Sequence, residues 1–199
     1  MEFISNLLYW LTTGLLVPVV VFLLYYFANS LISIGRFYGL YQQRMSINAK
    51  LNREIGQSDY IYVLNSKIIK ETNSKSAFLN AIKLINLNID KPIMCEKIIG
   101  DYEISAQKEL DKSKLLSKIG PMLGLMGTLI PMGPALVGLA TGDIESMANN
   151  MQVAFATTVV GLIIGAIGFI TLQVKQRWVA EDMNVLDYFI DSIKESSKE

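Results

Sequence analysis

The sequence predicts an all-α integral membrane protein with three transmembrane helices that continue into a cytoplasmic helical domain. Two long stretches without charge carry this prediction. No charged residue occurs from Phe3 to Gly35, and Asp143 and Glu145 are the only charges from Ile119 to Val174. A helix needs about 20 apolar residues to cross the ~30 Å hydrocarbon core of a bilayer. The first stretch therefore holds one span and the second holds two, at about Leu7–Leu31, Gly120–Ala140 and Met147–Val174.

Two other interpretations of these stretches fit less well. A signal peptide has a basic start, a short apolar core and a small-residue cleavage site. Here Met1 is followed by Glu2, the apolar run is too long, and Asn29 and Ser30 lead into further apolar residues. A buried helix of a soluble protein rarely stays uncharged over such a length.

The basic residues predict the orientation of the chain, because Lys and Arg concentrate on the cytoplasmic side of membrane proteins. All 18 of them lie between Arg36 and Lys118 or after Val174. We therefore expect a multi-pass protein of the cytoplasmic (inner) membrane, with its N-terminus outside and its C-terminus in the cytoplasm. The predicted parts are an external N-terminus with the first span (1–35), a cytoplasmic helical domain (36–118), the second span (119–141), an external hairpin (142–146), the third span (147–174) and a cytoplasmic C-terminal helix (175–199).

The cytoplasmic segments have the periodicity of amphipathic helices. From Ile93 to Leu116, apolar residues recur at three- and four-residue steps. The same pattern appears from Arg177 to Lys194, and a shorter helix is predicted from Ser76 to Leu87. The single cysteine, Cys95, is expected to be buried on the first of these faces. The apolar positions are Cys95, Ile98, Ile99, Tyr102, Ala106 and Leu110 in the first segment, and Val179, Met183, Leu186, Phe189 or Ile190, and Ile193 in the last.

The composition argues against catalysis and against a bound cofactor. The chain has no histidine, which removes most general-base, metal and proton-shuttle schemes. It has no phosphate-binding glycine loop with a lysine, no pair of cysteines, and no basic patch with interleaved aromatic residues for nucleic acid. We expect no catalytic residue, no metal site, no cofactor and no nucleic-acid partner.

The second and third spans are rich in small residues that let membrane helices approach closely. Gly124 and Gly127 lie in the second span with Pro131, and Gly161 and Gly165 lie in the third. Threonines accompany them on the same helical faces: Thr128 in the second span, and Thr158, with Thr157 beside it, in the third. A threonine hydroxyl can bond to a carbonyl one turn back in its own helix. The residues alone therefore leave open whether these threonines line a polar path or only pack helices.

Two blocks of sequence resemble a known family. Residues 121–129 read PMLGLMGTL and resemble the PLLGLLGTV signature of the MotA/TolQ/ExbB proton channel family. Residues 154–162 read AFATTVVGL and resemble the third-span ALxxTxxGL of the same family. The topology is similar to the three-span ExbB/TolQ branch. Pro131 and Pro134 replace a glycine-rich continuation, and Val153 stands where members often carry glutamate.

The resemblance implies a ring-forming subunit of a channel or motor complex, assembled as a pentamer and driven by a proton or sodium motive force. It implies a single-span partner (ExbD-, TolR- or MotB-like) inside the ring, faced by Thr128 and Thr158. The predicted spans contain no Asp, Glu, Lys, Arg or His. Because threonine does not titrate usefully, the titrating carboxylate must come from a partner, and the resemblance implies that it is a membrane aspartate of the single-span protein. Other partners are the lipid bilayer and the driving ion, and the residues do not distinguish protons from sodium.

Two alternatives remain, and one condition applies to the ion path. A passive three-span scaffold would use the same residues only for packing, and a solute transporter would usually have more spans or an internal repeat. Thr128 lies about 15 Å along the helix from Lys118, and Thr158 about 25 Å from Lys175, at ~1.5 Å per residue. The two hydroxyls share a depth only if the third span extends toward the cytoplasm before it reaches Lys175.

Overall fold

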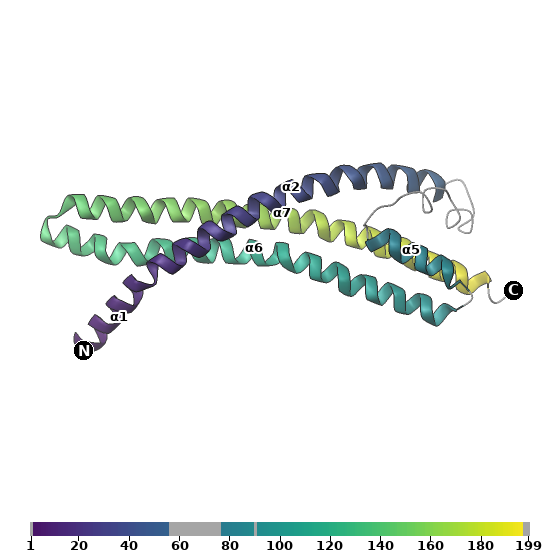
Figure 1. The fold of residues 1–199 in the computed structure, drawn as a ribbon, viewed down its shortest axis with the longest axis horizontal. Coiled ribbons are helices and arrows are strands. Elements are labelled where there is room, and N and C mark those ends of the chain that lie inside the picture. Colours follow the sequence, from purple (N-terminus) through teal and green to yellow (C-terminus); the bar gives the residue numbers. More distant parts are fainter. Residues whose placement is uncertain (1, 56–76, 90, 197–199) are drawn as a thin grey trace. The chain divides into compact units, whose positions relative to one another are not determined.

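The computed structural model describes residues 2–55, 77–89 and 91–196, and all regular structure in these ranges is helical. The helices are α1 (Glu2–Gly14), α2 (Leu16–Ile55), α5 (Ala77–Leu87), α6 (Pro92–Thr141) and α7 (Ile144–Ser196) (Figure 1). Three of them contain a segment long and apolar enough to cross a membrane, within Leu16–Gln42, Pro92–Thr141 and Ile144–Lys194. The prediction of an all-α chain with three such helices is confirmed. The predicted helix at Ser76–Leu87 is found from Ala77, and Ser76 lies outside the described residues.

The chain divides into two compact units. The first comprises residues 1–36 and 112–172, and the second comprises residues 37–111 and 173–199. The three long helices run without interruption from one set of residues into the other, so each contributes to both units. The predicted boundaries at 118 and 174 therefore mark changes of charge along continuous helices, because Lys and Arg are good helix formers and do not end a helix.

A turn at Leu15 separates α1 from α2 and falls inside the expected first span, Leu7–Leu31. Pro18 accounts for the weakness of this position, because it has no N–H to donate to the carbonyl of Gly14. Backbone hydrogen bonds on either side keep the chain helical. The amide of Leu15 donates to the carbonyl of Leu11 at 3.2 Å, and that of Val19 to the carbonyl of Leu15 at 3.1 Å. The membrane-compatible segment accordingly begins at Leu16.

A turn of two residues joins α6 to α7. Gly142 has a φ of 75°, a backbone conformation that glycine adopts without steric cost. The amide of Asp143 donates to the carbonyl of Gly138 at 2.8 Å, and that of Gly142 to Leu139 at 3.3 Å, which together form a Schellman motif. Asp143 then caps α7, since its Oδ1 accepts from the amide of Ser146 at 3.0 Å. Because of this cap α7 starts at Ile144, within the hairpin expected at 142–146.

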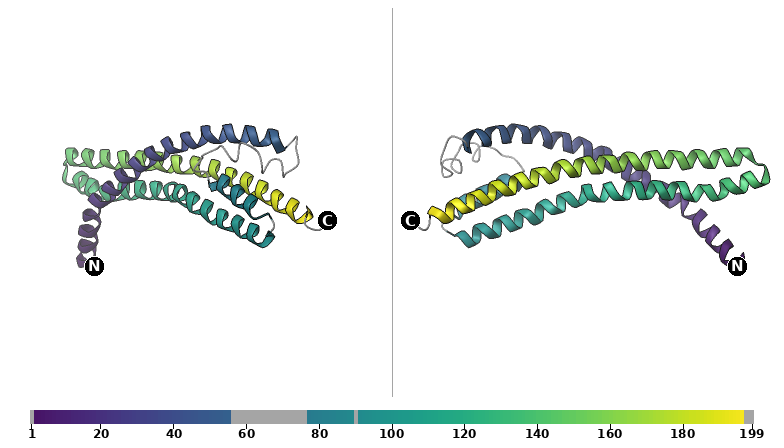
Figure 2. Two further views of the ribbon diagram at one scale, coloured as in Figure 1. Left: turned by 45° about the vertical axis from the view of Figure 1, so that its right-hand side comes forward. Right: turned by 180° about the vertical axis from the view of Figure 1, so that it is seen from behind.

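In the first unit, α2 packs on one side of the α6–α7 pair. The buried residues Leu23, Leu116 and Ile164 form a small core there, with Tyr26, Phe27, Leu123 and Val160 packed against it. Here α6 and α7 lie side by side in every view, with α2 in front of them in Figure 1 and behind them in the right panel of Figure 2.

The second unit has its own hydrophobic core, formed by α5, α6 and α7. The apolar faces predicted for α6 and α7 are confirmed, because Cys95, Leu186 and Phe189 are each 0% exposed. The core also contains Phe78, Leu79, Ala81, Ile82 and Ile85 from α5, Ile98, Ile99, Tyr102 and Ala106 from α6, and Ile190 and Ile193 from α7.

Candidate functional site

A seam of glycines holds α6 against α7 in the first unit. We define the glycine seam as Gly120, Gly124 and Gly127 on α6 with Gly161, Gly165 and Gly168 on α7, all of which are buried. A Cβ built on Gly161 would lie 2.6 Å from the carbonyl oxygen of Gly120 and 2.7 Å from the Cα of Gly124. A Cβ on Gly165 would lie 2.7 Å from the Pro121 ring. Only residues without side chains allow the two backbones to approach so closely.

The seam changes what the glycines imply about assembly. In the sequence, the small residues indicated that membrane helices approach closely but not which helices meet. In the structure, Gly124, Gly127, Gly161 and Gly165 face the partner helix of the same hairpin. They therefore explain packing within one chain and provide no argument of their own for a ring.

The three threonines lie at one depth of this hairpin. Gly124 lies against Thr158, whose Cα would be 3.4 Å from a Cβ built on that glycine. A Cβ built on Gly127 would lie 2.6 Å from the Cβ of Thr157. Thr128 follows Gly127 by one residue, a rise of about 1.5 Å. The three hydroxyl-bearing residues thus occupy a belt within about one helical turn. We call Thr128, Thr157 and Thr158 the threonine belt.

The alignment of α7 against α6 explains why the threonines share a depth although Thr128 and Thr158 lie at unequal distances from the nearest lysine in the sequence. A Cβ on Gly168 would lie 2.8 Å from the carbonyl carbon of Leu116, so α7 passes the level of Lys118 near this glycine. It then continues without charge as far as Leu172, where the first unit ends. α7 therefore extends past the level of Lys118 before it reaches Lys175, as a shared depth of Thr128 and Thr158 requires.

The members of the belt differ in exposure and in hydrogen bonding. Thr157 is buried, with 6% exposed, and its Oγ1 donates within α7 to Ala154 at 2.9 Å or Val153 at 3.0 Å. Thr158 is partly exposed, and its Oγ1 reaches across the seam to the carbonyl of Gly124 at 3.4 Å and within α7 to Ala154 at 3.2 Å. Thr128 is partly exposed and donates to Leu125 at 2.7 Å.

The comparisons with known proteins bear on this hairpin. Residues 92–187 match the family model described as the MotA/TolQ/ExbB proton channel family. The resemblance inferred from the two sequence blocks is confirmed, since the matched region contains both blocks, the glycine seam and the threonine belt. The comparison with curated proteins gives no significant match, and neither does the comparison with solved structures.

MotA/TolQ/ExbB proteins are channel and transport proteins rather than enzymes, and the site is compatible with that class. The belt has hydroxyl and carbonyl oxygens but no titratable side chain. In residues 2–55, 77–89 and 91–196, no group of three or more His, Cys, Asp or Glu could hold a metal ion.

Pro131 leaves one backbone carbonyl oxygen, that of Gly127, without its usual helical hydrogen bond at the depth of the belt. It is buried inside a continuous α6, although a proline has no N–H and usually disturbs the helix one turn before it. The carbonyl of Gly127 therefore receives no i+4 backbone hydrogen bond. The unbonded carbonyl could have been predicted from the sequence, because Pro131 follows Gly127 by four residues. That this carbonyl lies beside the threonine belt is known only from the contact between Gly127 and Thr157.

Thr128 and Thr158 both face away from α2. At 100° per residue, Thr128 lies about 40° around α6 from Gly124, and Thr158 about 60° around α7 from Gly161. Leu123 and Val160, which pack against the small core that contains Leu23 of α2, lie about 100° from the same glycines in the opposite sense. The side with the two threonines is otherwise apolar and exposed: Leu125 is 60%, Leu129 62%, Phe155 64% and Leu162 58% exposed.

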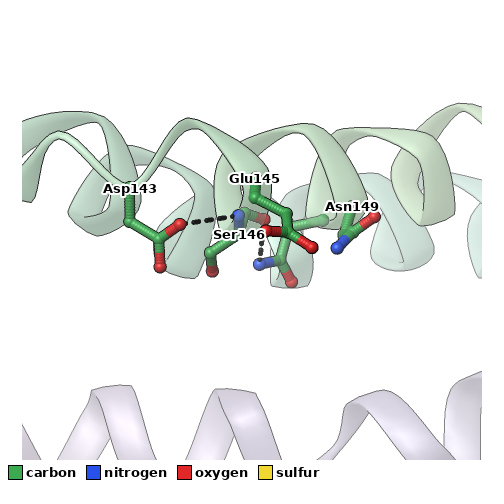
Figure 3. A pocket seen from close by; sticks show the side chains of 5 residues that line it. Asp143, Glu145, Ser146 and Asn149 are labelled. Atoms are coloured by element: carbon green, nitrogen blue, oxygen red, sulfur yellow. Dashed lines mark hydrogen bonds between the residues drawn. The ribbon is translucent and has the colours of Figure 1, made fainter.

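The tip of the hairpin holds the only charges between Ile119 and Val174. Asp143, Glu145, Ser146, Asn149 and Asn150 line a shallow open pocket on the first turns of α7 (Figure 3). Asn150 donates to the carbonyl of Ser146 at 2.9 Å. Asp143 and Asn150 thus both bond to backbone groups of Ser146 in α7, as expected for a helix start in a polar environment.

Proposed function

We propose that this chain is the ring-forming subunit of a proton- or sodium-motive-force-driven channel or motor complex of the MotA/TolQ/ExbB type. Five copies surround a single-span ExbD/TolR/MotB-like partner, which passes the work to a process outside the membrane. The chain lies in the inner membrane with its N-terminus and the Gly142–Asp143 turn outside. The spans correspond to the apolar parts of α2, α6 and α7.

The threonine belt is the observation that supports this proposal most directly. Its three hydroxyls share one depth on a hairpin that has no ionisable side chain between Ile119 and Leu139 or between Ser146 and Val174. A proton carrier needs a group that gains and loses a proton, and a cation site needs charge or several converging oxygens. The belt supplies oxygens only, so a partner's aspartate is needed to complete the site.

The exposed side with Thr128 and Thr158 is the surface that we assign to the partner helix. It lies opposite α2, and its large apolar side chains would face another membrane helix or lipid. Five such surfaces around a ring would present five belts at one depth, with which a central carboxylate could pair in turn.

The first test is purification of the tagged chain from its native membranes, followed by native mass spectrometry. The proposal expects five copies together with a short single-span protein that carries an aspartate near the start of its span. A monodisperse monomer or dimer under conditions that preserve membrane complexes would contradict it. The second test is ion flux in proteoliposomes. Flux should require both proteins and should be lost when the partner's aspartate becomes asparagine.

A passive membrane scaffold is the second candidate, and one observation favours it. Every hydroxyl of the threonine belt already has a backbone carbonyl partner, which is the arrangement that buried packing threonines adopt. The two candidates differ in what removal of a hydroxyl does. A scaffold would tolerate threonine-to-valine changes that keep the shape, whereas an ion path would not.

A further inference from the structure

We propose that residues 37–45 of α2 form a releasable arm, held on α6 and α7 of the second unit by a polar clasp centred on Asp182 and not by the hydrophobic core. The clasp consists of Arg44 on α2, Tyr102 on α6, and Trp178 and Asp182 on α7. Release would free the arm while α5, α6 and α7 stay packed together. This proposal is independent of the ion-driven function.

The clasp joins three helices through one buried carboxylate. Asp182 is 4% exposed. Arg44 Nη1 donates to its Oδ2 at 2.9 Å, Arg44 Nη2 pairs with its Oδ1, and the Tyr102 hydroxyl also donates to Oδ2. Arg44 Nη2 donates further to the carbonyl of Trp178 at 2.9 Å. The guanidinium is planar and presents a fork of donors, so this geometry is specific to arginine.

Aromatic contacts complete the attachment of the arm. Phe37 stacks on Trp178 with ring centroids 5.5 Å apart and planes at 12°, and Tyr41 lies beside the same indole at 6.0 Å. The Arg44 guanidinium carbon lies 5.4 Å from the centre of that ring. Phe37, Tyr41 and Arg44 follow one another at four- and three-residue steps, so one face of α2 makes all these contacts.

No arm residue whose side chain the structure describes belongs to the hydrophobic core of the second unit. Its members come from α5, α6 and α7, and none is an α2 residue whose side chain is described. The described side chains of the arm beyond the clasp are exposed instead: Tyr38 is 62%, Leu40 45% and Met45 62% exposed. Loss of the clasp would therefore detach the arm from α6 and α7 without opening a cavity in the core.

The clasp also contains an unfavourable group, which makes release easier. The Arg44 Nε is buried and has no hydrogen-bond partner among the described residues, although its side chain is 18% exposed overall. A buried donor without a partner is costly, and release would return it to water. A polar attachment of this kind is orientation-specific and can break and reform, unlike an apolar core.

Hydrogen exchange of the full-length protein in lipid nanodiscs, followed by mass spectrometry, tests the proposal. The test variant is Asp182→Asn, which keeps the size of the side chain and removes its charge. The matched control is Lys97→Gln, which removes an exposed ion pair of 3.7 Å with Asp101 in the same unit. A helical arm without tertiary contacts frays, because isolated helices of this length are marginal in water.

In Asp182→Asn, amides of residues 37–45 should exchange roughly tenfold to a hundredfold faster, as expected for the loss of one or two charge-assisted hydrogen bonds. Amides of 77–87 and 186–193 should keep the protection of the unaltered protein, and Lys97→Gln should change neither segment. Unchanged exchange in 37–45 would overturn the proposal. Equal loss of protection in the core segments would also overturn it, because the clasp would then be part of one cooperative core.

Discussion

Gly161 lies directly against the backbone of Gly120, so that a Cβ on Gly161 would fall 2.6 Å from the Gly120 carbonyl oxygen. The neighbouring atom is backbone, which cannot rotate away as a side chain would. Gly161→Ala should therefore force α6 and α7 apart and destabilise the hairpin by about 1–3 kcal/mol, the usual cost of overpacking a close contact. The midpoint of detergent-induced unfolding, measured by circular dichroism, reports this change.

Gly133→Ala is the matched control, since Gly133 is also inside α6 but a Cβ there would meet nothing within 4 Å. Alanine favours a helix over glycine by roughly 0.5–1 kcal/mol, so this variant should be as stable as the original chain or slightly more stable. Similar destabilisation by both substitutions would mean that the glycine seam is not a close contact.

The threonine belt predicts graded effects of threonine-to-valine changes on ion flux. Thr128→Val and Thr158→Val should each assemble normally and lower flux at least about tenfold, a change that corresponds to roughly one lost hydrogen bond. Thr157→Val should be milder, because that side chain is 6% exposed and bonds only within α7. Flux through the complex in proteoliposomes separates these outcomes, and normal flux in all three variants would mean that the threonines only pack the helices.

Cysteine labelling tests the orientation, but native Cys95 is unsuitable as the internal probe. Its side chain is 0% exposed, its Sγ contacts the carbonyl of Asn88 at 3.2 Å, and burial raises the pKa of the thiol. A neutral, covered thiol reacts slowly. We expect Cys95 to stay unlabelled at neutral pH even after permeabilisation, and to react only when the protein is denatured.

In a Cys95→Ala background, Ser146→Cys should be labelled in intact cells by a reagent that does not cross membranes. Ser105→Cys, on the exposed side of α6, should be labelled only after permeabilisation. The reverse pattern would invert the orientation, in spite of the distribution of Lys and Arg.

Tyr102→Phe should weaken the second unit in a pH-dependent manner. Burial, followed by the nearby Asp182 carboxylate and the hydrogen bond to it, raises the pKa of Tyr102 above its ordinary value of 10.0. Its contribution is therefore complete below pH 10 and declines as the pH rises through the folded-state value. At pH 7 the variant should lose about 1.5–3 kcal/mol, the typical value of a hydrogen bond to a charged group.

Unfolding measured between pH 7 and pH 11 checks both parts of this prediction. The phenylalanine ring can still pack near Phe78, whose centroid lies 6.2 Å from that of Tyr102, so the packing contribution is retained. The stability gap between the two proteins should narrow above pH 10. A gap that stays constant over this range would show that the hydroxyl has no part in the clasp.

The sequence predicted the helical faces well because burial follows the helical period. Cys95, Leu186 and Phe189 lie on the faces that their spacing indicated, and all are fully buried. It placed the ends of helices less well. The cap formed by Asp143 and the break near Pro18 depend on single hydrogen bonds, whereas the boundaries had been drawn from changes of charge along helices that do not stop there.

The sequence did not predict which residues far apart in the chain contact one another. Arg44 and Asp182 are 138 residues apart, and nothing in either segment indicates the other. The register of α6 on α7 was equally hidden, because glycines at spacings of three and four are compatible with several alignments. Only the observed contacts of Gly124 with Thr158, and of Gly127 with Thr157, bring the belt to one depth.

The glycine seam also affects how the sequence of such a protein can change. The close contact between α6 and α7 requires only that the six positions of the glycine seam remain small. It places no constraint on the outward residues except that they be apolar enough to face lipid. Leucine, methionine, valine and phenylalanine can therefore replace one another at little energetic cost on those parts of α6 and α7 that face lipid alone. Two chains with this hairpin could retain the same backbone while sharing few outward residues. The positions of their small residues would then show that they are related more reliably than their percentage identity.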